Sequence, residues 1–444
     1  MKTSRRSFLK QVSALSVAPL ILSSNVWGAK HKPSGRIVMG FIGMGKQSRG
    51  LLGGFLHRKI CRVVAVCDVD TTRRLDAQKR VNEFYTGRPE LGTPDCAAYN
   101  DFRELIARDD INAVCIATPD HWHAIPTIAA LESGKDVYCE KPLTHNIHEA
   151  IAVMKAVKKN KRVLQTGSMQ RSMQEFRVAC ELVRNGAIGK IDRVECSFGP
   201  PGIPCDLPEE PMEPGLDWDM WIGPGPMRPY NSVLSPRGMH DHFPNWRTYK
   251  EYGGGMVCDW GAHHLDIAQW GLGMDHSGPK EVHPPADPNA TYGAVLHYDK
   301  GIRVIHKEGF GAHFFGEDGE VKVNRGRFEF LRDGKRVAGF VNREEGGSLE
   351  STIVQVERDF LSDAKVKLYK SRDHIRDFID CVQARTRPIT NEEVGGRSAI
   401  CCHLMNQAYY NHEVIKWKPK RMRFARHGGK EEWLTRDYRA PWKL

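Results

Sequence analysis

Asp259 and His263 stand four residues apart in a segment that is otherwise apolar and rich in glycine. At the helical spacing i, i+4 the two side chains share one helix face. A histidine near its unperturbed pKa can take a proton from a substrate hydroxyl at neutral pH, and a carboxylate beside it can orient the ring or bind a hydroxyl. The pair is therefore a candidate acid–base centre. The competing interpretation is a capping Asp and a core His with satisfied hydrogen bonds.

A glycine-rich loop forms a second candidate site. Residues 36–42 (RIVMGFI) are typical of a buried strand, and the loop Gly43–Ser48 (GMGKQS) leads into an apolar helical pattern. The first glycine permits a tight turn, and the second lets a pyrophosphate approach the backbone at a helix N-terminus. Ser48 stands where a third glycine is usual. The residues expected to contact a dinucleotide are Gly43, Met44, Gly45, Lys46 and Gln47.

Asp68 follows a second apolar run, residues 63–67. It lies about 20 residues beyond the glycines, where an acid binds the hydroxyls of the adenosine ribose. An acid at this position favours NAD. Arg73 lies close enough to keep NADP open as the alternative.

Two further apolar runs end in polar motifs. Residues 111–117 lead into Thr118–His123 (TPDHWH), and residues 136–139 lead into Glu140–Pro142 (EKP). Alternating strand and helix patterns of this length predict a parallel, doubly wound sheet, which binds ligands beyond the carboxyl ends of its strands. The glycine loop and these two motifs are therefore expected at one edge. The competing interpretation is that they are structural turns only.

With its EKP motif and the segment 253–266 (GGGMVCDWGAHHLD), the sequence resembles the Gfo/Idh/MocA family, named for glucose–fructose oxidoreductase and inositol dehydrogenase. The resemblance covers residues 36–415. It implies that Lys141, Asp259 and His263 meet at the nicotinamide of a bound cofactor. Further cofactor contacts are expected from Thr118, Pro119, His121, His123, Glu140 and Lys141. For His123 a purely local role at a helix start stays open.

In such a site, Lys141 would orient the reacting oxygen and relay its proton, while His263 would act as the base. Asp259 would orient the histidine or bind a substrate hydroxyl. The candidates for substrate contact are Gln170, Arg171, Trp246, Arg247 and His264. Gln170 and Arg171 could equally contact the cofactor, and His264 could equally be structural.

Trp246 and Arg247 are interpreted as functional because indole rings stack on sugar faces and guanidinium groups pair with hydroxyls or acids. Trp218 and Trp221, in a Pro- and Gly-rich insert, are interpreted as pinning a loop to the sheet.

The predicted fold class is α/β, with an N-terminal Rossmann sheet and a C-terminal α+β domain that contains an open, mostly antiparallel sheet. The predicted segments are a signal peptide (1–29), the Rossmann domain (36–160), the second domain (161–415) and a basic extension (416–444). The resemblance implies a homo-oligomer, a dimer or tetramer, formed through the outer face of the second sheet.

The formal charge of +11 comes from the two ends of the chain. The positive side chains concerned are Lys2, Arg5, Arg6 and Lys10 near the start, and Lys416, Lys418, Lys420, Arg421, Arg423, Arg426 and Lys430 in an acid-free tail. The body between them is close to neutral and offers no basic stripe for a nucleic acid. The tail is interpreted as a solvated extension, with contact to an acidic neighbour or a membrane surface as the alternative.

The 12 cysteines form no CxxC pair, and Cys67, Cys115 and Cys139 lie inside apolar runs. This pattern is typical of small buried hydrophobic side chains, and it predicts neither a disulfide framework nor a metal site. The histidines His240 and His242 also lack a diagnostic spacing, so a metal requirement stays open.

Residues 4–10 (SRRSFLK) precede a weakly apolar stretch and small residues near position 29. This pattern resembles a twin-arginine export signal, with an ordinary secretory signal as the alternative. It implies the twin-arginine translocation machinery as a partner and a periplasmic or otherwise exported location. The apolar stretch is too short to span a membrane, so no stable membrane anchor is expected.

An exported enzyme has no evident supply of free NAD, which favours a tightly bound cofactor that is restored within each turnover. We therefore expect an NAD-dependent oxidoreductase acting on a sugar, cyclitol or glycoside hydroxyl. The main alternative is an NAD-dependent glycosidase that works by transient oxidation, elimination, water addition and re-reduction. The second alternative is a non-catalytic carbohydrate-binding protein.

Overall fold

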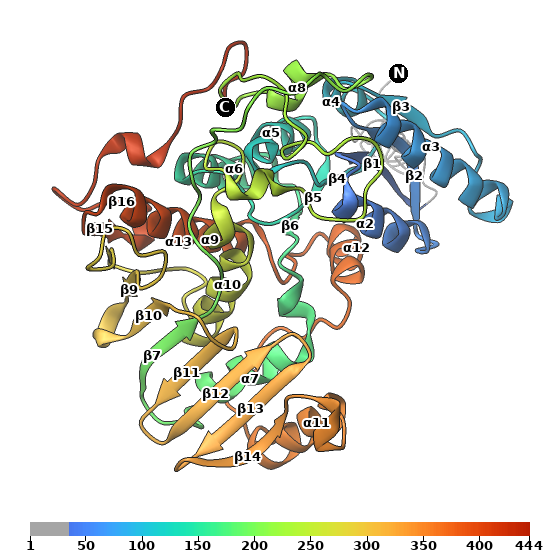
Figure 1. Cartoon of the computed structure of the whole chain (residues 1–444). Coiled ribbons are helices and arrows are strands. Elements are labelled where there is room, and N and C mark those ends of the chain that lie inside the picture. Colours follow the sequence, from blue (N-terminus) through green and yellow to red (C-terminus); the bar gives the residue numbers. More distant parts are fainter. Residues whose placement is uncertain (1–34) are drawn as a thin grey trace, which may run out of the picture. The chain divides into compact units, whose positions relative to one another are not determined.

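A parallel sheet dominates the first part of the chain in the computed structural model, which describes residues 35–444. Six strands of this described part pair in the order β3-β2-β1-β4-β5-β6, all parallel (Figure 1). Their bounds are β1 Ile37–Ile42, β2 Cys61–Cys67, β3 Ala97–Tyr99, β4 Ala113–Ile116, β5 Asp136–Cys139 and β6 Leu164–Thr166. The order confirms the predicted doubly wound Rossmann sheet. The predicted leader, residues 1–29, lies outside the described residues.

Helices cover both faces of this sheet because its strands are apolar on both sides. The bounds are α2 Lys46–Leu56, α3 Thr71–Thr86, α4 Phe102–Ile106, α5 Ala124–Glu132, α6 Ile147–Asn160 and α12 His374–Ala384. Successive residues of β1 point to opposite faces: Phe41 packs with α2, α3 and α12, and Ile42 packs with α4, α5 and α6. The ring of Phe55 on α2 lies 6.0 Å from that of Phe378 on α12.

A second sheet, mostly antiparallel, forms the other half. Within the described residues it has ten strands in the order β14-β13-β12-β11-β7-β10-β9-β8-β15-β16, and the β7–β10 pair is parallel. The bounds are β7 Ile191–Cys196, β8 Glu281–His283, β9 Val295–His297, β10 Arg303–His306, β11 Ala312–Gly316, β12 Gly319–Asn324, β13 Arg327–Arg332, β14 Lys335–Phe340, β15 Ile415–Lys418 and β16 Arg423–Phe424. This sheet confirms the predicted open, mostly antiparallel sheet in the C-terminal half of the chain.

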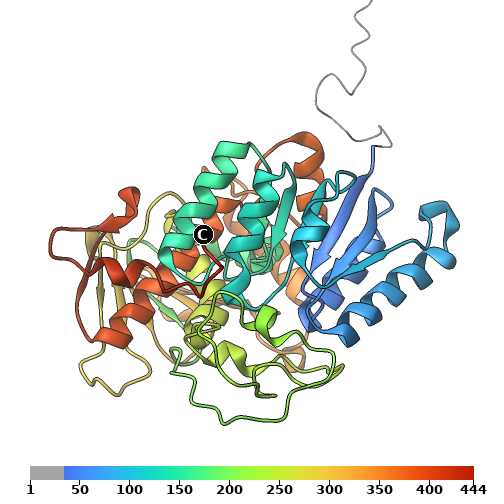
Figure 2. The ribbon, with the colours of Figure 1, turned by 90° about the horizontal axis from the view of Figure 1, so that it is seen from above.

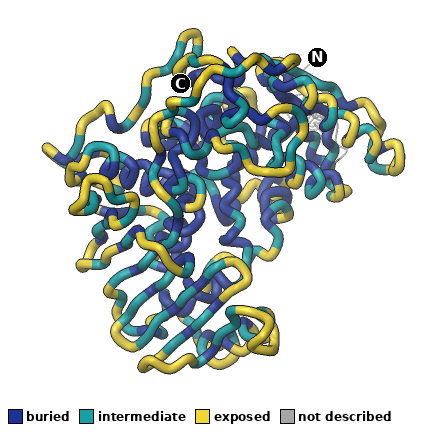
Figure 3. Tube along the Cα trace, in the orientation of Figure 1, coloured by how far each residue is buried: buried dark blue, intermediate teal, exposed yellow. Residues whose placement is uncertain are grey.

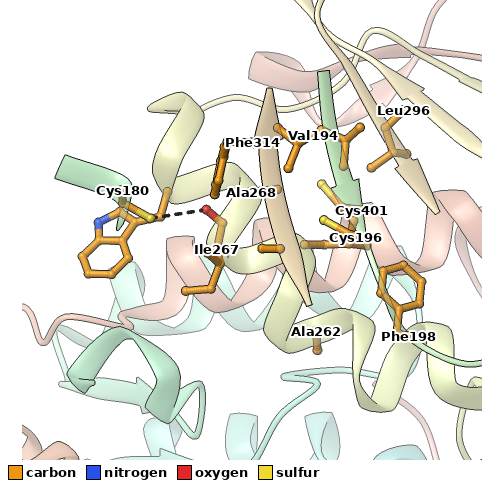
Figure 4. Packing of buried hydrophobic residues seen from close by; sticks show 14 of the residues in the cluster. Cys180, Val194, Cys196, Phe198, Ala262, Ile267, Ala268, Leu296, Phe314 and Cys401 are labelled. Atoms are coloured by element: carbon orange, nitrogen blue, oxygen red, sulfur yellow. Dashed lines mark hydrogen bonds between the residues drawn. The ribbon is translucent and has the colours of Figure 1, made fainter. Parts of the chain in front are cut away.

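Four helices pack on one face of the second sheet: α7 Gln174–Arg184, α10 Gly261–Leu272, α11 Leu349–Phe360 and α13 Glu392–Asn411. Alternate residues of a strand point to opposite faces of its sheet. In β12, Val321 and Val323 therefore point to the helices and are buried in this core, and Lys322 between them is only half-buried. Figure 4 shows the core, with Phe314 of β11 against α10. Gly271 permits this approach, because a Cβ there would lie 2.5 Å from the Phe314 ring.

The predicted boundary at residues 160 and 161 is wrong. Strand β6, which lies after this boundary, is hydrogen-bonded to β5 and completes the first sheet. Helix α12 also returns to that sheet from far along the chain, since Phe378 packs on Tyr138 of β5. The first sheet is therefore covered partly by the C-terminal half of the sequence.

The predicted solvated extension, residues 416–444, is also wrong. Its first residues form β15 and β16 of the second sheet, where Trp417 and Phe424 are buried. Its last residues pack on the first half of the chain: Arg436 pairs with the buried Glu149 at 3.0 Å, and the rings of Trp442 and Trp122 lie 4.7 Å apart. The tail is thus part of the folded body.

Residues 198–254 form an insert with few regular elements, chiefly the short helix α8 Trp218–Ile222. Figure 2 shows this segment, in green and yellow-green, beside the blue and teal elements of the first sheet. The rings of Trp218 and Trp221 stack at 4.7 Å inside an aromatic cluster. This packing agrees with their interpretation as residues that pin a loop. Leu216 also makes an isolated antiparallel bridge with Asp70.

The twelve cysteines all lie in the described region and are all free thiols. Cys205 is half-buried and the others are buried, as expected for small core side chains. Figure 3 shows the same distribution for residues 35–444, with buried strands and helices inside and exposed loops around them. No helix among residues 35–444 is both long and apolar enough to cross a bilayer.

Replacing Phe378 by Ala is expected to lower the free energy of unfolding by about 3–5 kcal/mol, because the ring is fully buried and joins α12 to the first sheet. Denaturant titration followed by circular dichroism measures the loss. The control is Val354→Ala on α11, where the side chain is 54% exposed and the expected change is below about 0.5 kcal/mol. Equal effects of the two substitutions would contradict the packing described.

Candidate active site

A cavity of about 410 Å³ lies at the carboxyl ends of β1, β2, β4 and β5. Its opposite wall comes from the insert, from α9 (Gly255–Asp259) and from the start of α10. In open α/β sheets, ligands bind at this edge, and a cavity of this size suits a cofactor or substrate. The three strand-end motifs therefore meet at one cavity, as predicted.

The glycine loop forms the cavity wall at the end of β1. Gly43 has a φ of 83°, and a Cβ there would lie 2.8 Å from the Thr118 backbone nitrogen, so only glycine fits. Gly45 begins α2 without a side-chain cap and has open space where a Cβ would point. Free N–H groups at an uncapped helix start bind phosphate, so the loop fits a dinucleotide.

The other loop residues divide into two groups. Lys46 and Gln47 line the cavity, and their contact with a dinucleotide stays a prediction. Met44 does not line it: its side chain is buried, and its N–H donates to Asp68 Oδ2 at 2.6 Å. Met44 therefore shapes the loop, and its role as a cofactor contact stays a prediction. Ser48, at the position of the third glycine, is fully buried.

Asp68 lies at the end of β2 and lines the cavity, where the adenosine ribose of a dinucleotide is expected. Its Oδ1 accepts from the Asp70 N–H at 2.8 Å, and burial raises its pKa above 3.8. Arg73 also lines the cavity, but its guanidinium donates to Ser235 Oγ at 3.2 Å and to the Pro236 carbonyl. The choice between NAD and NADP stays a prediction.

Only some of the predicted cofactor contacts in the motif after β4 line the cavity. Thr118, Pro119 and His123 line the cavity. His123 also holds two loops together: its Nδ1 lies 2.7 Å from the Pro142 oxygen and its Nε2 lies 2.9 Å from the Thr118 oxygen. Burial lowers the pKa of His123 to about 4, so the ring is neutral and donates to one of these oxygens at a time.

His121 was predicted as a cofactor contact, but it does not line the cavity among the described residues. The ring is fully buried, with Nε2 3.0 Å from the Trp221 oxygen and Nδ1 3.3 Å from the Tyr252 oxygen. It therefore joins the first sheet to the insert.

Glu140 and Lys141, the first residues of the EKP motif, both line the cavity. Glu140 Oε1 accepts from Gln47 Nε2 at 3.0 Å, which ties the end of β5 to the glycine loop. Burial raises the pKa of Glu140 above 4.5.

Lys141 forms the central ion pair of the cavity with Asp259. Its Nζ donates to Asp259 Oδ1 and, at 3.0 Å, to the Asp259 carbonyl. Arg247 Nε lies 3.5 Å from the same carboxylate oxygen. Burial alone would raise the pKa of Asp259, but the charges of Lys141 and Arg247 outweigh it and lower that pKa below 3.8. Asp259 is therefore ionised.

His263 lines the same cavity and is 5% exposed. Its Nδ1 has no hydrogen-bond partner among residues 35–444. Burial, followed by the charges of Lys141 and Arg325, holds its pKa well below 6.5. The ring is therefore neutral at physiological pH and can accept a proton.

The geometry corrects the prediction of one continuous helix for Asp259 and His263. Asp259 ends α9, His263 lies in the first turn of α10, and Trp260 separates the two helices. Both side chains still reach the cavity. The Asp259 carboxylate pairs with Lys141, so of its two predicted roles, orienting the histidine is not what the structure shows.

Three of the predicted substrate contacts lie outside the cavity lining. Arg171 is 2% exposed and pairs with Asp266 and Asp275, each at 2.8 Å, so it is structural. His264 Nδ1 lies 2.6 Å from the Ser197 oxygen, and the ring is buried. Gln170 is also buried. In contrast, Trp246 and Arg247 line the cavity, with the guanidinium 4.2 Å from the indole centroid.

The cavity residues that sequence reasoning missed include Asp120, Trp260 and Arg325, which lie near the reaction centre. Asp120 lies inside the motif after β4 and is 4% exposed, and burial raises its pKa well above 3.8. Because Asp120 follows a predicted strand, its position in the sequence could have indicated that it lines the cavity. Trp260 lies between the two helices of the acid–base pair. Arg325 lies at a hairpin turn whose direction no local pattern indicates.

No group of three or more His, Cys, Asp and Glu side chains in the described part of the chain is arranged to hold a metal ion. The rings of His240 and His242 are 4.5 Å apart, but no third ligand accompanies them among these residues.

Replacing Gly45 by Val is expected to weaken NADH binding at least about 10-fold, because the side chain would fill the phosphate cradle at the start of α2. The fold has room for it, since nothing lies within 4 Å of a Cβ at this position. The matched control is Gly50→Val on the exposed side of α2. Fluorescence titration with NADH measures affinity, and unchanged affinity in the Gly45 variant would contradict the assigned cradle.

Two family descriptions match this chain. "Oxidoreductase family, NAD-binding Rossmann fold" covers residues 37–168, and "Oxidoreductase family, C-terminal alpha/beta domain" covers residues 202–444.

Curated relatives match the chain over shorter stretches. A "Glycosyl hydrolase family 109 protein 2" of Shewanella sp. (strain ANA-3) is 32% identical over 161 residues, which are 33% of this chain and 35% of that protein. An "Inositol 2-dehydrogenase" of Rhodococcus jostii (strain RHA1) is 32% identical over 128 residues, which are 28% of this chain and 35% of that protein. The chain thus spans about a third of the length of these relatives.

Solved structures share the fold over most of the chain. Aldose-aldose oxidoreductase from Caulobacter crescentus has a TM-score of 0.56 and 18% identity, covering 86% of this chain and 100% of that one. The WlbA dehydrogenase from Bordetella pertussis has a TM-score of 0.59 and 16% identity, covering 86% and 98%. Because the matched descriptions cover both halves, the chain belongs to the Gfo/Idh/MocA family of oxidoreductases, with an NAD-binding Rossmann domain followed by the family's α/β domain.

Proposed function

We propose that this protein is an NAD-dependent oxidoreductase that removes a hydride from a hydroxyl-bearing carbon of a sugar, cyclitol or glycoside. The observation that carries the proposal is the meeting of Lys141, Asp259 and His263 at the cavity that the glycine loop also lines. A carbohydrate-binding protein without catalysis would need no neutral base beside an ion-paired lysine. The family membership supports the same reaction class.

Three side chains have separate roles in the proposed alcohol oxidation. His263 is neutral and its Nδ1 lacks a partner in the described residues, so it can take the proton of the substrate hydroxyl. The Lys141 ammonium donates to the same hydroxyl oxygen and stabilises the charge that develops there. Asp259 holds the ammonium in place. The bound nicotinamide, when oxidised, supplies the hydride acceptor.

Contacts of residues 235–247 support a tightly held cofactor. Arg73 on α3 donates to the Ser235 hydroxyl and the Pro236 carbonyl. Lys46 donates to the Asp241 carbonyl, and Arg49 pairs with the Asp241 carboxylate at 2.8 Å. The segment is therefore fastened across the loop expected to hold the pyrophosphate, and release requires these contacts to break.

Tight retention suits the expected export. The twin-arginine pattern near residues 4–10 supports our proposal that the protein is periplasmic and passes through the twin-arginine machinery in the folded state. A cofactor loaded before export would then be recycled, by oxidising one substrate and reducing another. Assembly into a dimer or tetramer, and the choice of NAD over NADP, remain proposals of the same kind.

A redox-neutral glycosidase is the second candidate. The curated relatives favour it, since they include glycosyl hydrolase family 109 proteins beside inositol dehydrogenases. In that reaction the oxidised carbon acidifies its neighbouring C–H, the glycosidic substituent leaves, water adds, and the hydride returns. His263 would then also serve as the C–H base.

One experiment tests both candidates on the purified native protein. Denaturation is expected to release a stoichiometric dinucleotide, which chromatography identifies. Incubation with glycosides in heavy water then separates the reactions: deuterium at the carbon beside the cleaved position supports the glycosidase, and net oxidised sugar with a reduced acceptor supports the oxidoreductase. A protein with neither bound cofactor nor turnover would exclude both.

Replacing His263 by Gln is expected to lower kcat by roughly 10²–10⁴-fold, because the base is lost. In the wild-type protein, the acidic limb of the pH–rate profile should lie below pH 6.5. The sign follows from the lowered pKa of His263: the neutral, active form persists to lower pH than for a free histidine. An acidic limb centred near pH 6.5 or above would contradict this assignment.

A further inference from the structure

Arg325 differs from the other cations on the His263 side of the cavity in lacking an acidic partner. Lys141 and Arg247 both contact the Asp259 carboxylate. Among the described residues, Arg325 makes no ion pair with a carboxylate. Its guanidinium donates to the neutral Gln170 Oε1 at 3.4 Å and lies 4.6 Å from the centroid of the Trp260 ring.

The backbone holds Arg325 in place. It lies with Gly326 in the two-residue turn between β12 and β13, where Asn324 pairs with Arg327 and Gly326 has a φ of 71°. The Gly326 N–H donates to Glu175 Oε1 at 3.1 Å, which fixes the hairpin tip to α7. Gln170 positions the guanidinium by accepting its hydrogen bond. Its own side chain is buried and does not line the cavity.

Three cations and three acids line this side of the cavity, and among these acids only Asp259 forms an ion pair with a cation. Asp259 forms its ion pairs with Lys141 and Arg247, and its charge acts on Arg325 only from beyond ion-pair distance. The other two acids here, Asp120 and Glu140, make no ion pair with Arg325 among the described residues, and burial raises the pKa of each.

Trp260 adds an apolar surface beside the cation. Its side chain lines the cavity yet remains 38% exposed, which is unusual for an indole. A pyranose ring presents C–H faces that stack on such a ring, and a guanidinium fork matches a carboxylate. Together they offer what a sugar with an acidic substituent requires.

We propose that Arg325 is a substrate-binding residue that selects sugar acids, by pairing with a carboxylate of the substrate while Trp260 supports its ring. This rests on the proposed function and specifies its substrate class. The cofactor phosphates are not the partner of Arg325, because they belong at the start of α2, whereas Arg325 enters from the second sheet beside Trp260 and His263.

The test uses the holoprotein and three matched pairs of probes: glucuronate with glucose, galacturonate with galactose, and mannuronate with mannose. Calorimetry should show at least one acid binding about 10-fold or more tightly than its parent sugar, as expected for a charge-assisted hydrogen bond. Arg325→Gln should abolish the preference. Arg325→Lys should keep part of it, because the charge remains but the fork is lost.

Arg327→Gln is the matched control, since Arg327 lies on the same hairpin, is exposed and does not line the cavity. It should bind acids as the wild type does. The proposal is overturned if no acid is preferred over its parent, or if the preference survives Arg325→Gln.

The absorbance of the bound nicotinamide separates this proposal from the proposed function. A neutral sugar that reduces the cofactor equally in wild type and Arg325→Gln, with no acid preferred, leaves the oxidoreductase intact and overturns the role of Arg325. An acid that binds through Arg325 but never changes the cofactor supports the acid subsite and counts against the oxidoreductase.

Discussion

The ion pair between Lys141 and Asp259 is the contact around which the cavity is organised. It joins the end of β5 to the end of α9, two points that are 118 residues apart in the chain. Both side chains are only 16% exposed, so their attraction is screened less than at a surface. Removing Asp259 would leave the partly buried charge of Lys141 without its carboxylate partner. The same lysine also acts on His263, where its charge helps to keep the ring neutral.

The residues predicted best from the sequence stand at the ends of apolar runs. The loop Gly43–Gln47, the acid Asp68 and the EKP motif each follow a strand, and parallel strands bring their carboxyl ends to one edge without further information. For these positions, local pattern and overall topology impose the same constraint. This is why motifs far apart in the sequence could be assigned to one cavity.

Residue type alone failed where the partners are remote in sequence. Arg171 lies beside a strand end, but Asp266 and Asp275 take its charge into the core. Strands β15 and β16 have few residues, and β15 pairs with the remote strand β8. The sequence of this segment therefore shows its basic side chains more clearly than a strand pattern, and it was interpreted as a solvated extension. The direction in which the hairpin carries Arg325 depends on Glu175 and the rest of the second sheet. Such features are set by tertiary packing and not by local periodicity.

The course of the chain restrains any hinge between the two halves of the molecule. The backbone passes from the first sheet to the second after β6, returns with α12, leaves again with α13, and returns a last time so that Arg436 lies on α6 and Trp442 packs on Trp122, just before α5. A rigid-body swing would have to bend all these connections together. Residues 235–247 line the cavity and are held to the first half mainly by side chains, so release of this segment would open the cavity without bending those connections.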